Sequence, residues 1–385
     1  MKITHIRTPL HDTSVIRACL VLPLGSAFDP SDKAGLTHVL EHCLYAQAVQ
    51  AWQNGQKQYV LEFFTATTFR DHIEFDIIVS VGDEGCIDEL LANLTMPLKI
   101  TEDAFRRELE TLHRELIEQE SHPDYAHEQA EAQWLYPETI KKPNGGTSAS
   151  IRNIELADVV EWHSTLSDSE ILLITTENYY SKMPLKEAQS WRNSHPVAFE
   201  HVAGPANLKL DRSYGEDAII HVFLMAQVAN ESHNNYLLLL CALLDNQLRM
   251  QAEASGDMYY FGTDTFTVGD QTELSLTVTV APEKVSYYQA FLRDVLEKAG
   301  DISETDFIDL RDKLAKTQSI TQSDPAVRFA NYCFSAIAWG QSWHEYHEAE
   351  KSLARVELAE FLKFLERHIG DPETVKIAQI VPAKA

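Results

Sequence analysis

The sequence predicts an α+β fold made of two homologous domains, each a mostly antiparallel sheet packed with helices. Its 385 residues suffice for two domains that each bury a core of their own. The chain also repeats itself, because Ile100–Phe105 corresponds to Ile302–Phe307. Each of these segments opens a helix behind an N-cap-like residue, Thr101 in the first copy and Ser303 in the second.

The rest of the repeat keeps the same order in both copies. Each copy reads as a strand, a helix, a strand, several helices and a closing strand. The paired segments are the strands 74–80 and 273–279, the helices 84–94 and 283–296, and the closing strands 170–174 and 375–380. Between the copies, Pro and Gly interrupt any regular pattern. We therefore expect an N-terminal domain over 1–185, a linker over 186–210 and a C-terminal domain over 211–385.

Charge and composition narrow the class of protein. The formal net charge of −26 argues against nucleic acid as a partner, because phosphates would be repelled, whereas basic peptides would be attracted. No apolar run approaches the ~20 residues that span a bilayer, and the first residues lack the apolar core of a signal peptide. The 5 widely spaced cysteines favour reduced core residues over disulfides. We expect a soluble, cytoplasmic protein that does not bind membranes.

The segment from Gly35 to His42 carries two histidines and a glutamate at the spacing of a zinc hydrolase. His38 and His42 stand four residues apart, so on a helix their side chains share a face and can reach one cation. Glu41 flanks the same face, and a carboxylate beside the metal can take a proton from its water. The order His-x-x-Glu-His inverts the better-known zinc-peptidase signature. A third ligand is needed to complete such a site.

A predicted helix within 105–120 offers carboxylates to this motif. Its apolar stripe recurs at helical spacing through Phe105, Leu109, Leu112 and Leu116. Glu108 and Glu115 lie seven residues apart, within ~20° of each other on the edge of the stripe. Two carboxylates beside a buried face are costly unless a cation meets them, and zinc would do so. The alternative is that both are solvated residues on the flank of an acidic helix.

With these motifs the chain resembles the pitrilysin/insulinase family of zinc peptidases, which includes the mitochondrial processing peptidases. Gly25-Ser26 with Gly35-Leu36-Thr37-His38 looks like the family's lead-in to its zinc helix, and Thr65–His72 looks like its Asn-Ala-x-Thr strand. Glu108 with Glu115 resembles its Glu-x(6)-Glu helix. Gly146–Ile154 with His163 resembles a later landmark of the family. The likeness runs through most of the first half and includes the duplicated domains.

The resemblance implies one zinc ion per chain, held by His38, His42 and Glu115. The fourth position would be left for a water, whose pKa the metal lowers to ~7. Glu41 would act as general base on that water and pass the proton to the leaving amine. Glu108 would orient the ligand shell from beside Glu115. The implied activity is that of a zinc endopeptidase that cleaves peptides or small unstructured polypeptides.

In the second half, Arg249 and Tyr259 stand where the family has an Arg and a Tyr that hold the substrate and polarise its scissile carbonyl. A cation and a phenol near a developing oxyanion supply the charge stabilisation that hydrolysis needs. The gap between the two residues is three residues longer here than is usual in the family, so Tyr260 stays open as the alternative. An exposed helix Arg and a strand Tyr without a catalytic role are equally compatible with the sequence.

Two parts of the sequence depart from the family's metal and substrate sites. In the second copy, Leu310 and Thr317 stand where the first copy has its two carboxylates, and no His-x-x-Glu-His appears. In the first copy, Thr65 replaces the family's Asn, and Glu62-Phe63-Phe64 replaces a Gly pair. That strand edge is where the family's peptide substrate adds itself as an extra strand. Subsite preference therefore cannot be read from the sequence.

The resemblance also implies a partner subunit. Family members of this length pair as homodimers or with a related subunit, enclosing a chamber in which Arg249 and Tyr259 can complete the site of the opposite chain. Two rival functions stay open: a non-catalytic structural subunit of the same fold, and a peptide binder that uses an acidic chamber without cutting. The intact set of His38, Glu41, His42 and Glu115 favours the peptidase.

Overall fold

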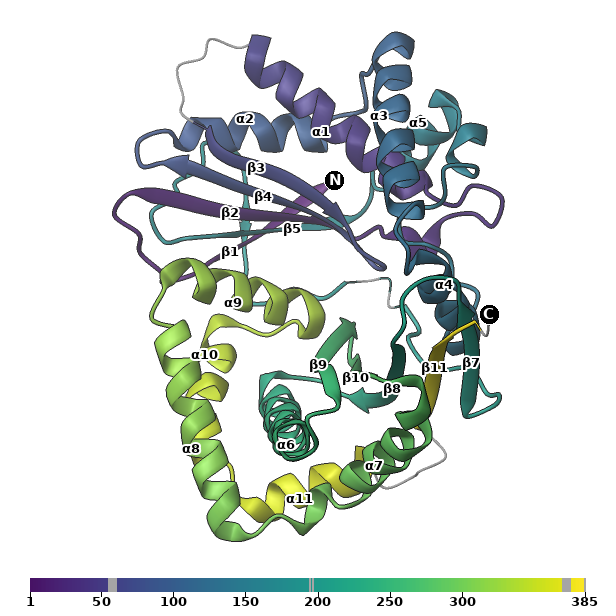
Figure 1. Cartoon of the computed structure of the whole chain (residues 1–385). Coiled ribbons are helices and arrows are strands. Elements are labelled where there is room, and N and C mark those ends of the chain that lie inside the picture. The colour runs from purple at the N-terminus through teal and green to yellow at the C-terminus, as the bar shows by residue number, and fades with distance from the viewer. Residues whose placement is uncertain (55–60, 194, 196, 369–374, 384–385) are drawn as a thin grey trace. The chain divides into compact units, whose positions relative to one another are not determined.

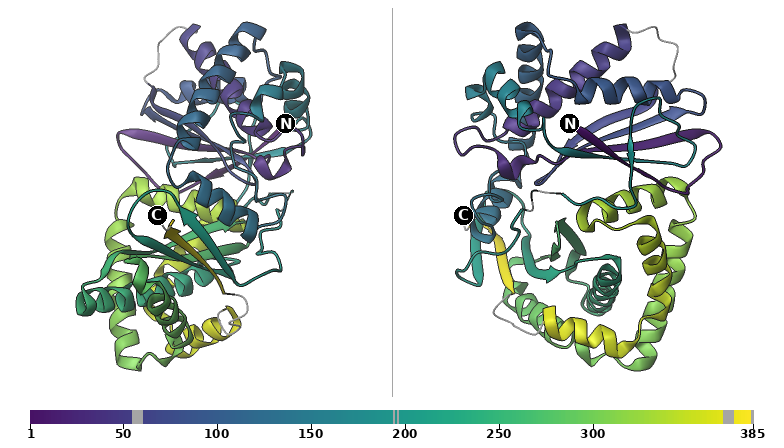
Figure 2. Two further views of the ribbon diagram at one scale, coloured as in Figure 1. Left: turned by 45° about the vertical axis from the view of Figure 1, so that its right-hand side comes forward. Right: turned by 180° about the vertical axis from the view of Figure 1, so that it is seen from behind.

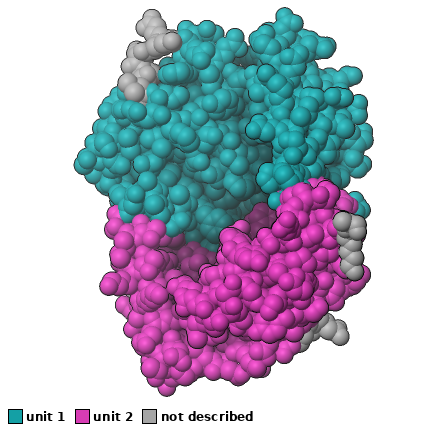
Figure 3. All heavy atoms as spheres, in the orientation of Figure 1, with its two compact units in different colours: residues 1–125, 138–197, 324–343 teal, residues 126–137, 198–323, 344–385 magenta. Residues whose placement is uncertain are grey.

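The computed structural model describes the chain as two compact units. The described residues are 1–54, 61–193, 195, 197–368 and 375–383. Unit 1 is built from residues 1–125, 138–197 and 324–343, and unit 2 from residues 126–137, 198–323 and 344–385 (Figure 3). Neither unit is therefore one continuous stretch of sequence. Residues 194 and 196 of the expected linker lie outside the described residues.

Within the described residues, unit 1 contains a six-stranded mixed sheet in the order β3-β4-β2-β5-β1-β6. β1 runs parallel to β5 and to β6, and the other neighbours are antiparallel. The strands are β1 (Lys2–Arg7), β2 (Val15–Leu22), β3 (Leu61–Thr68), β4 (Ile73–Ser80), β5 (Glu170–Thr175) and β6 (Lys186–Glu187). The helices are α1 (Leu36–Asn54), α2 (Glu84–Thr95), α3 (Glu102–Glu120), α5 (Leu156–Ser164) and α9 (Pro325–Trp339), with 3-10 turns at Ser26–Phe28 and Ile151–Asn153.

The core of unit 1 lies on one face of this sheet. Strand alternation turns one set of apolar residues of β2 and β4 to that face: Ile16, Ala18, Leu20, Leu22, Ile73, Phe75, Ile77 and Val79. α1 and α2 cover them, with Leu40, Leu44 and Leu90 among the buried side chains (Figure 1). Each large apolar side chain of this kind stabilises the folded state by roughly 1.5–3 kcal/mol when it is fully buried. α9 lies on the opposite face of the sheet (Figure 1).

Unit 2 has, in its described part, a five-stranded sheet in the order β7-β11-β8-β10-β9. Its strands are β7 (Asn207–Arg212), β8 (Ala218–Gln227), β9 (Met258–Val268), β10 (Gln271–Val280) and β11 (Lys376–Pro382). Its helices are α4 (Tyr125–Leu135), α6 (Glu231–Ser255), α7 (Val285–Glu297), α8 (Glu304–Thr321), α10 (Trp343–Ser352) and α11 (Leu358–His368). Figure 2 shows the yellow β11 beside its parallel neighbour β7. Among the described helices, none combines the length and the hydropathy that a bilayer span requires.

Five strands of the first sheet are repeated in the second, and β6 has no counterpart among the described strands. The strands β3, β4, β2, β5 and β1 of the first correspond in order to β9, β10, β8, β11 and β7 of the second. The predicted N-caps are confirmed, because Thr101 Oγ1 accepts the Ala104 N–H at 3.2 Å and Ser303 Oγ accepts the Asp306 N–H at 3.1 Å. The predicted α+β fold with duplicated sheet-and-helix domains is confirmed. The parallel pairs β1–β5 and β7–β11 were not predicted.

Helix α4 packs in unit 2 although it follows α3 in the sequence. Glu131 of α4 is buried and forms an ion pair with His221 of β8, with 2.7 Å between Oε1 and Nδ1. Just after the helix, the Tyr136 hydroxyl donates to Glu273 Oε1 of β10 at 2.7 Å. Buried carboxylates are stable when they are paired in this way. These contacts hold α4 on the second sheet. Its counterpart in the repeat, α9, likewise lies on the sheet of the other copy, the first sheet.

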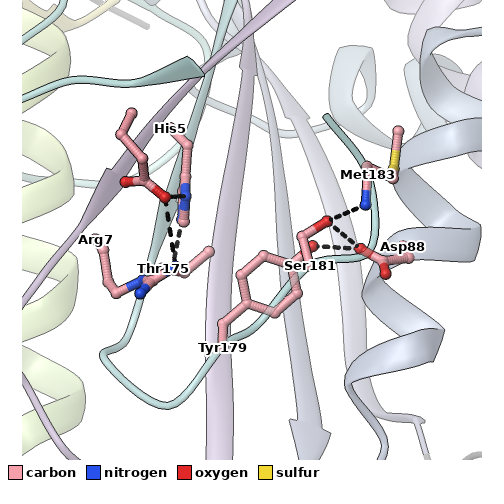
Figure 4. Close-up of polar contacts among 8 residues, drawn as sticks. His5, Arg7, Asp88, Thr175, Tyr179, Ser181 and Met183 are labelled. Atoms are coloured by element: carbon pink, nitrogen blue, oxygen red, sulfur yellow. Dashed lines mark hydrogen bonds and ion pairs between the residues drawn. The ribbon is translucent and has the colours of Figure 1, made fainter. Parts of the chain in front are cut away.

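A polar cluster fixes the segment that follows β5 in unit 1 (Figure 4). Asp88 of α2 accepts hydrogen bonds from the hydroxyls of Tyr179 and Ser181 at 2.6 and 2.7 Å, and from the Lys182 N–H at 2.9 Å. Tyr179 is fully buried, so its hydroxyl depends on this partner. Asp88 therefore ties residues 179–182 to the helical layer.

We predict that Asp88→Ala lowers the free energy of unfolding by about 1–3 kcal/mol, because it leaves a buried hydroxyl without a partner. Urea denaturation followed by circular dichroism measures the loss. Glu89→Ala, one residue along α2, is the control and should change stability by no more than about 0.5 kcal/mol. Equal losses in the two variants would contradict the anchoring role.

Candidate metal centre

The first turn of α1 is held by a buried carboxylate from the preceding loop. Asp29 accepts the N–H groups of Gly35 and Thr37 at 2.7 and 2.9 Å, and the Thr37 hydroxyl at 2.6 Å. These donors satisfy backbone groups that a helix start leaves unpaired. Burial raises the pKa of Asp29 to about 6, although the three donors favour its charged form. The cap fixes the start of the helix at Leu36, two residues before His38.

His38 and His42 lie one turn apart on α1, with ring centroids separated by 5.0 Å. Their side chains are 13% and 17% exposed, so both are largely shielded from water. Burial and the neighbouring His42 lower the pKa of His38 to about 4. Burial would also lower the pKa of His42, but the carboxylates of Glu108 and Glu115 outweigh it and raise that pKa to about 9. The carboxylates around His42 thus favour positive charge beside this ring.

α3 brings two carboxylates to these imidazoles. Glu115 Oε1 lies 3.9 Å from His38 Nε2, and Glu115 Oε2 lies 3.6 Å from His42 Nε2. Glu108 Oε2 lies 3.8 Å from the other ring nitrogen of His42, Nδ1. The charges and hydrogen bonding of His42 and His38 lower the pKa of Glu115. Glu115 therefore faces both rings, and Glu108 is placed to orient one of them.

The donor set fits a zinc ion. One atom each from His38, His42 and Glu115 lies within 4.8 Å of the others. Ligands about 2.0–2.2 Å from a tetrahedral zinc are roughly 3.4 Å apart, so the separations of 3.6 and 3.9 Å need only small adjustments. Two imidazoles and a carboxylate are the donor types of catalytic zinc sites. Glu108 beside His42 Nδ1 matches the carboxylate–histidine pairing that commonly supports a metal ligand.

Glu41 lies beside the donor set without being part of it. Its Oε2 is 3.7 Å from His38 Nε2, and its side chain is only 8% exposed. Burial raises the pKa of Glu41, which moves it toward the range of a useful general base. The Thr68 hydroxyl, at the end of β3, donates to Glu41 Oε2 at 3.1 Å and fixes its direction. Sequence reasoning placed Thr68 in a strand motif but did not predict this contact with Glu41.

A loop over 142–146 closes the other side of His38. The Asn144 side chain donates to the Thr68 carbonyl and accepts from the Ser26 hydroxyl, which fixes the loop beside α1. Gly145 lies so close that a Cβ there would be 2.5 Å from His38 Nδ1. Gly146, at φ +79°, passes over Gly35 at a distance that leaves no room for a side chain. Sequence reasoning missed Asp29, Asn144 and Gly145, because their roles arise from loops that meet in space.

The predicted residues of the second half lie in unit 2. Arg249 of α6 lines a pocket of about 830 Å³ between α6, α7 and α8, which also includes Leu310 and Thr317. In the repeat, α6 and α8 correspond to α1 and α3, so Leu310 and Thr317 stand where the first copy has Glu108 and Glu115. Tyr259 and Tyr260 are adjacent residues of β9 and are 61% and 59% exposed. Their roles and that of Arg249 stay predictions.

Comparison with known proteins gives a family match and a fold match. The family model described as Insulinase (Peptidase family M16) matches residues 5–144, which contain His38, Glu41, His42, Glu108 and Glu115. No curated protein sequence matches the chain.

Three solved structures illustrate the likeness of fold. The periplasmic protease PqqL from Escherichia coli has a TM-score of 0.73 at 12% identity, over 96% of this chain and 43% of its own. A peptidase M16 inactive domain from Pseudomonas fluorescens has a TM-score of 0.76 at 11% identity, over 99% and 95% of the two chains. A protease from Helicobacter pylori has a TM-score of 0.74 at 15% identity, over 98% and 96%. This chain therefore spans less than half of PqqL but nearly all of the other two.

We predict that Gly145→Ala weakens zinc binding by about 10- to 100-fold, because the new Cβ would displace the His38 ring. Competition with a fluorescent zinc chelator measures the affinity. Gly204→Ala, at a glycine with open space around it, is the control and should bind like the parent. Unchanged zinc affinity in Gly145→Ala would show that the loop does not position His38.

Proposed function

We propose that this chain, whose residues 5–144 match the family model described as Insulinase (Peptidase family M16), is a zinc-dependent endopeptidase. Its metal ligands would be His38, His42 and Glu115. The observation that carries the proposal is the convergence of three donor atoms from α1 and α3, all within 4.8 Å of one another. The raised pKa of His42 supports it, since the carboxylates of Glu108 and Glu115 favour positive charge beside that ring.

The proposed reaction is hydrolysis of a peptide bond. When bound, zinc would act as a Lewis acid that polarises the scissile carbonyl and lowers the pKa of the attacking water to about 7. Glu41 would take the proton from that water as it attacks the carbonyl carbon, and would then deliver the proton to the leaving nitrogen. Thr68 would keep the Glu41 carboxylate in position through its 3.1 Å hydrogen bond. Glu108 would hold the orientation of His42 through Nδ1.

The substrate would be an extended segment of peptide. β3 is an edge strand of the first sheet and pairs with β4 on one side only. Its outer edge is therefore available for main-chain hydrogen bonds with a peptide. Because Thr68 ends this strand and contacts Glu41, a peptide added along β3 would lead directly to the proposed base. The net charge of −26 favours basic segments. Phe63, which is 49% exposed on β3, offers an apolar contact.

A second chain would complete the working enzyme. We propose a dimer, with a second copy or with a related subunit, that encloses a chamber around the substrate. Arg249 and either Tyr259 or Tyr260 would hold the substrate carbonyl, from the same chain or from the partner. A guanidinium and a phenol can both donate hydrogen bonds to a developing oxyanion.

The second candidate function is a non-catalytic subunit of the same fold. It is favoured by the close likeness of fold to the peptidase M16 inactive domain from Pseudomonas fluorescens, with a TM-score of 0.76. The complete set of His38, Glu41, His42 and Glu115 favours the peptidase instead. Metal content and cleavage of an unstructured basic peptide, with and without a chelator, separate the two.

We predict that Glu41→Gln keeps zinc but lowers kcat by about 100-fold or more, because the amide cannot accept the proton from water. Zinc is measured by atomic emission after dialysis, and turnover with a mixture of unstructured peptides read by mass spectrometry. Glu110→Gln, at an exposed position of α3, is the matched control and should retain turnover. A Glu41→Gln protein that cleaves at the parental rate would defeat the assignment.

His42→Ala is expected to lose both zinc at the proposed site and turnover, since it removes one of three protein ligands. His113→Ala is the control, because His113 lies on α3 and bonds to Arg152 rather than to the donor set. The measurements are zinc affinity, peptide cleavage and the circular dichroism spectrum. If His42→Ala cleaves peptides as the parent does, the proposed metal centre is not the active site.

A further inference from the structure

A cavity of about 470 Å³ lies between α3 and the 3-10 turn Ile151–Asn153, within unit 1. Its volume falls in the range of small-molecule sites, roughly 300–1,000 Å³. Its lining combines two guanidiniums, an imidazole, a carboxylate and two apolar side chains: Arg114, Arg152, His113, Glu110, Leu109 and Ile151. We call this cavity the Arg152 pocket.

The guanidinium of Arg152 is held in place without being neutralised. Its Nε and Nη2 both donate to His113 Nε2, at 3.1 and 2.8 Å. Because arginine only donates, the imidazole must accept through Nε2 and keep its own proton on Nδ1. Among the described residues Arg152 forms no ion pair, and three of its five N–H donors have no protein partner. A guanidinium fixed by a neutral acceptor is suited to bind a carboxylate from outside the chain.

Arg114 adds a second positive charge to the same lining. Its Nε donates to the Glu110 carbonyl at 3.3 Å, and its Nη2 donates to the Thr111 hydroxyl at 3.4 Å. Neither acceptor is charged, and Arg114 forms no ion pair in the part of the chain that the structure describes. Two guanidiniums against the one carboxylate of Glu110 leave the lining positively charged. In a chain with a net charge of −26, the Arg152 pocket is a local reversal of sign that attracts an anion.

The two apolar side chains of the lining are fixed by packing. Ile151 is fully buried, and Leu109 is half-buried against the core of unit 1. A water-exposed arginine gains little from a bare carboxylate, because solvent competes for both charges. An anion that also carries an apolar body gains in addition by covering Leu109 and Ile151. The Arg152 pocket therefore favours an anion with an apolar body over a simple inorganic ion.

We propose that the Arg152 pocket binds a small organic carboxylate. Its carboxylate group would lie on Arg152, whose Nη1 and Nη2 still offer two parallel N–H donors, with Arg114 as the second cation. Its apolar body would cover Leu109 and Ile151. The ligand would be held by contacts alone, so no bond is made or broken.

The Arg152 pocket is separate from the proposed metal centre, although both use α3. At ~100° per residue, His113 lies ~160° around the helix axis from Glu115, so the two side chains leave α3 on different sides. None of the proposed zinc ligands lines the pocket. The proposal therefore does not depend on catalysis.

Isothermal titration calorimetry of 2-naphthoate into the full-length His42→Ala protein tests the proposal. This background removes the proposed metal centre, which could itself bind a carboxylate. We expect one 2-naphthoate per chain. 2-Naphthamide, which has the same apolar body without the charge, should bind at least tenfold more weakly. Acetate, which has the charge without the apolar body, should also bind at least tenfold more weakly.

Substitutions in the same background locate the ligand. Arg152→Gln should weaken 2-naphthoate binding at least tenfold, because it removes the fixed guanidinium. Arg152→Lys keeps the charge without the two parallel donors and should recover only part of the affinity. Arg106→Gln is the matched control, since this exposed α3 arginine is paired with Glu102 at 2.8 Å, and it should bind like the parent. Circular dichroism checks the fold of each variant.

Three results would each overturn the proposal: no binding of 2-naphthoate, equal binding of 2-naphthamide or acetate, or parental affinity in Arg152→Gln. None of them would touch the peptidase proposal, which is tested by cleavage in the Glu41→Gln and His42→Ala proteins.

Discussion

The rotation of α1 about its own axis is the constraint on which the site depends. Val39, Leu40, Cys43 and Leu44 are buried against the sheet, and these apolar contacts allow the helix only one orientation. The histidines must then point away from the sheet, toward α3. α3 is fixed in the same way by its own apolar stripe, so its carboxylates meet the imidazoles at the border of two buried faces. Packing against the core thereby brings the carboxylates of Glu108 and Glu115 within 4 Å of the imidazoles, where a cation could bind between them.

The two copies show what the fold requires and what it does not. The second sheet has the same strand order as the first, so the architecture does not need the metal. Leu310 and Thr317 occupy the places of the two α3 carboxylates, and they line a pocket of about 830 Å³. The chemistry of the first half is thus carried by a few polar side chains on a scaffold that is stable in both forms.

Local patterns in the sequence were informative, and distant contacts were not. The repeat, the two N-caps and the fold class follow from hydrophobic spacing and short-range capping, which a single stretch of sequence contains. Helical spacing also agrees with the position of Glu115 opposite His38 and His42. The roles of Asp29 and Gly145 could not be predicted, because they depend on loops that approach α1 in space. The packing of α4 was equally hidden, since its polar residues find their partners on a strand about 90 residues away.

The placement of α9 affects how the protein can be made. The first sheet is complete at β6, which ends at Glu187, yet the helix on its second face spans Pro325–Trp339. A ribosome that has released the whole first sheet must therefore still synthesise well over a hundred residues before that face is covered. Until then, one face of the first sheet is uncovered in the nascent chain. Chaperones bind such surfaces, and aggregates form on them. Each sheet thus packs with a helix from the other half of the sequence, α9 on the first sheet and α4 on the second.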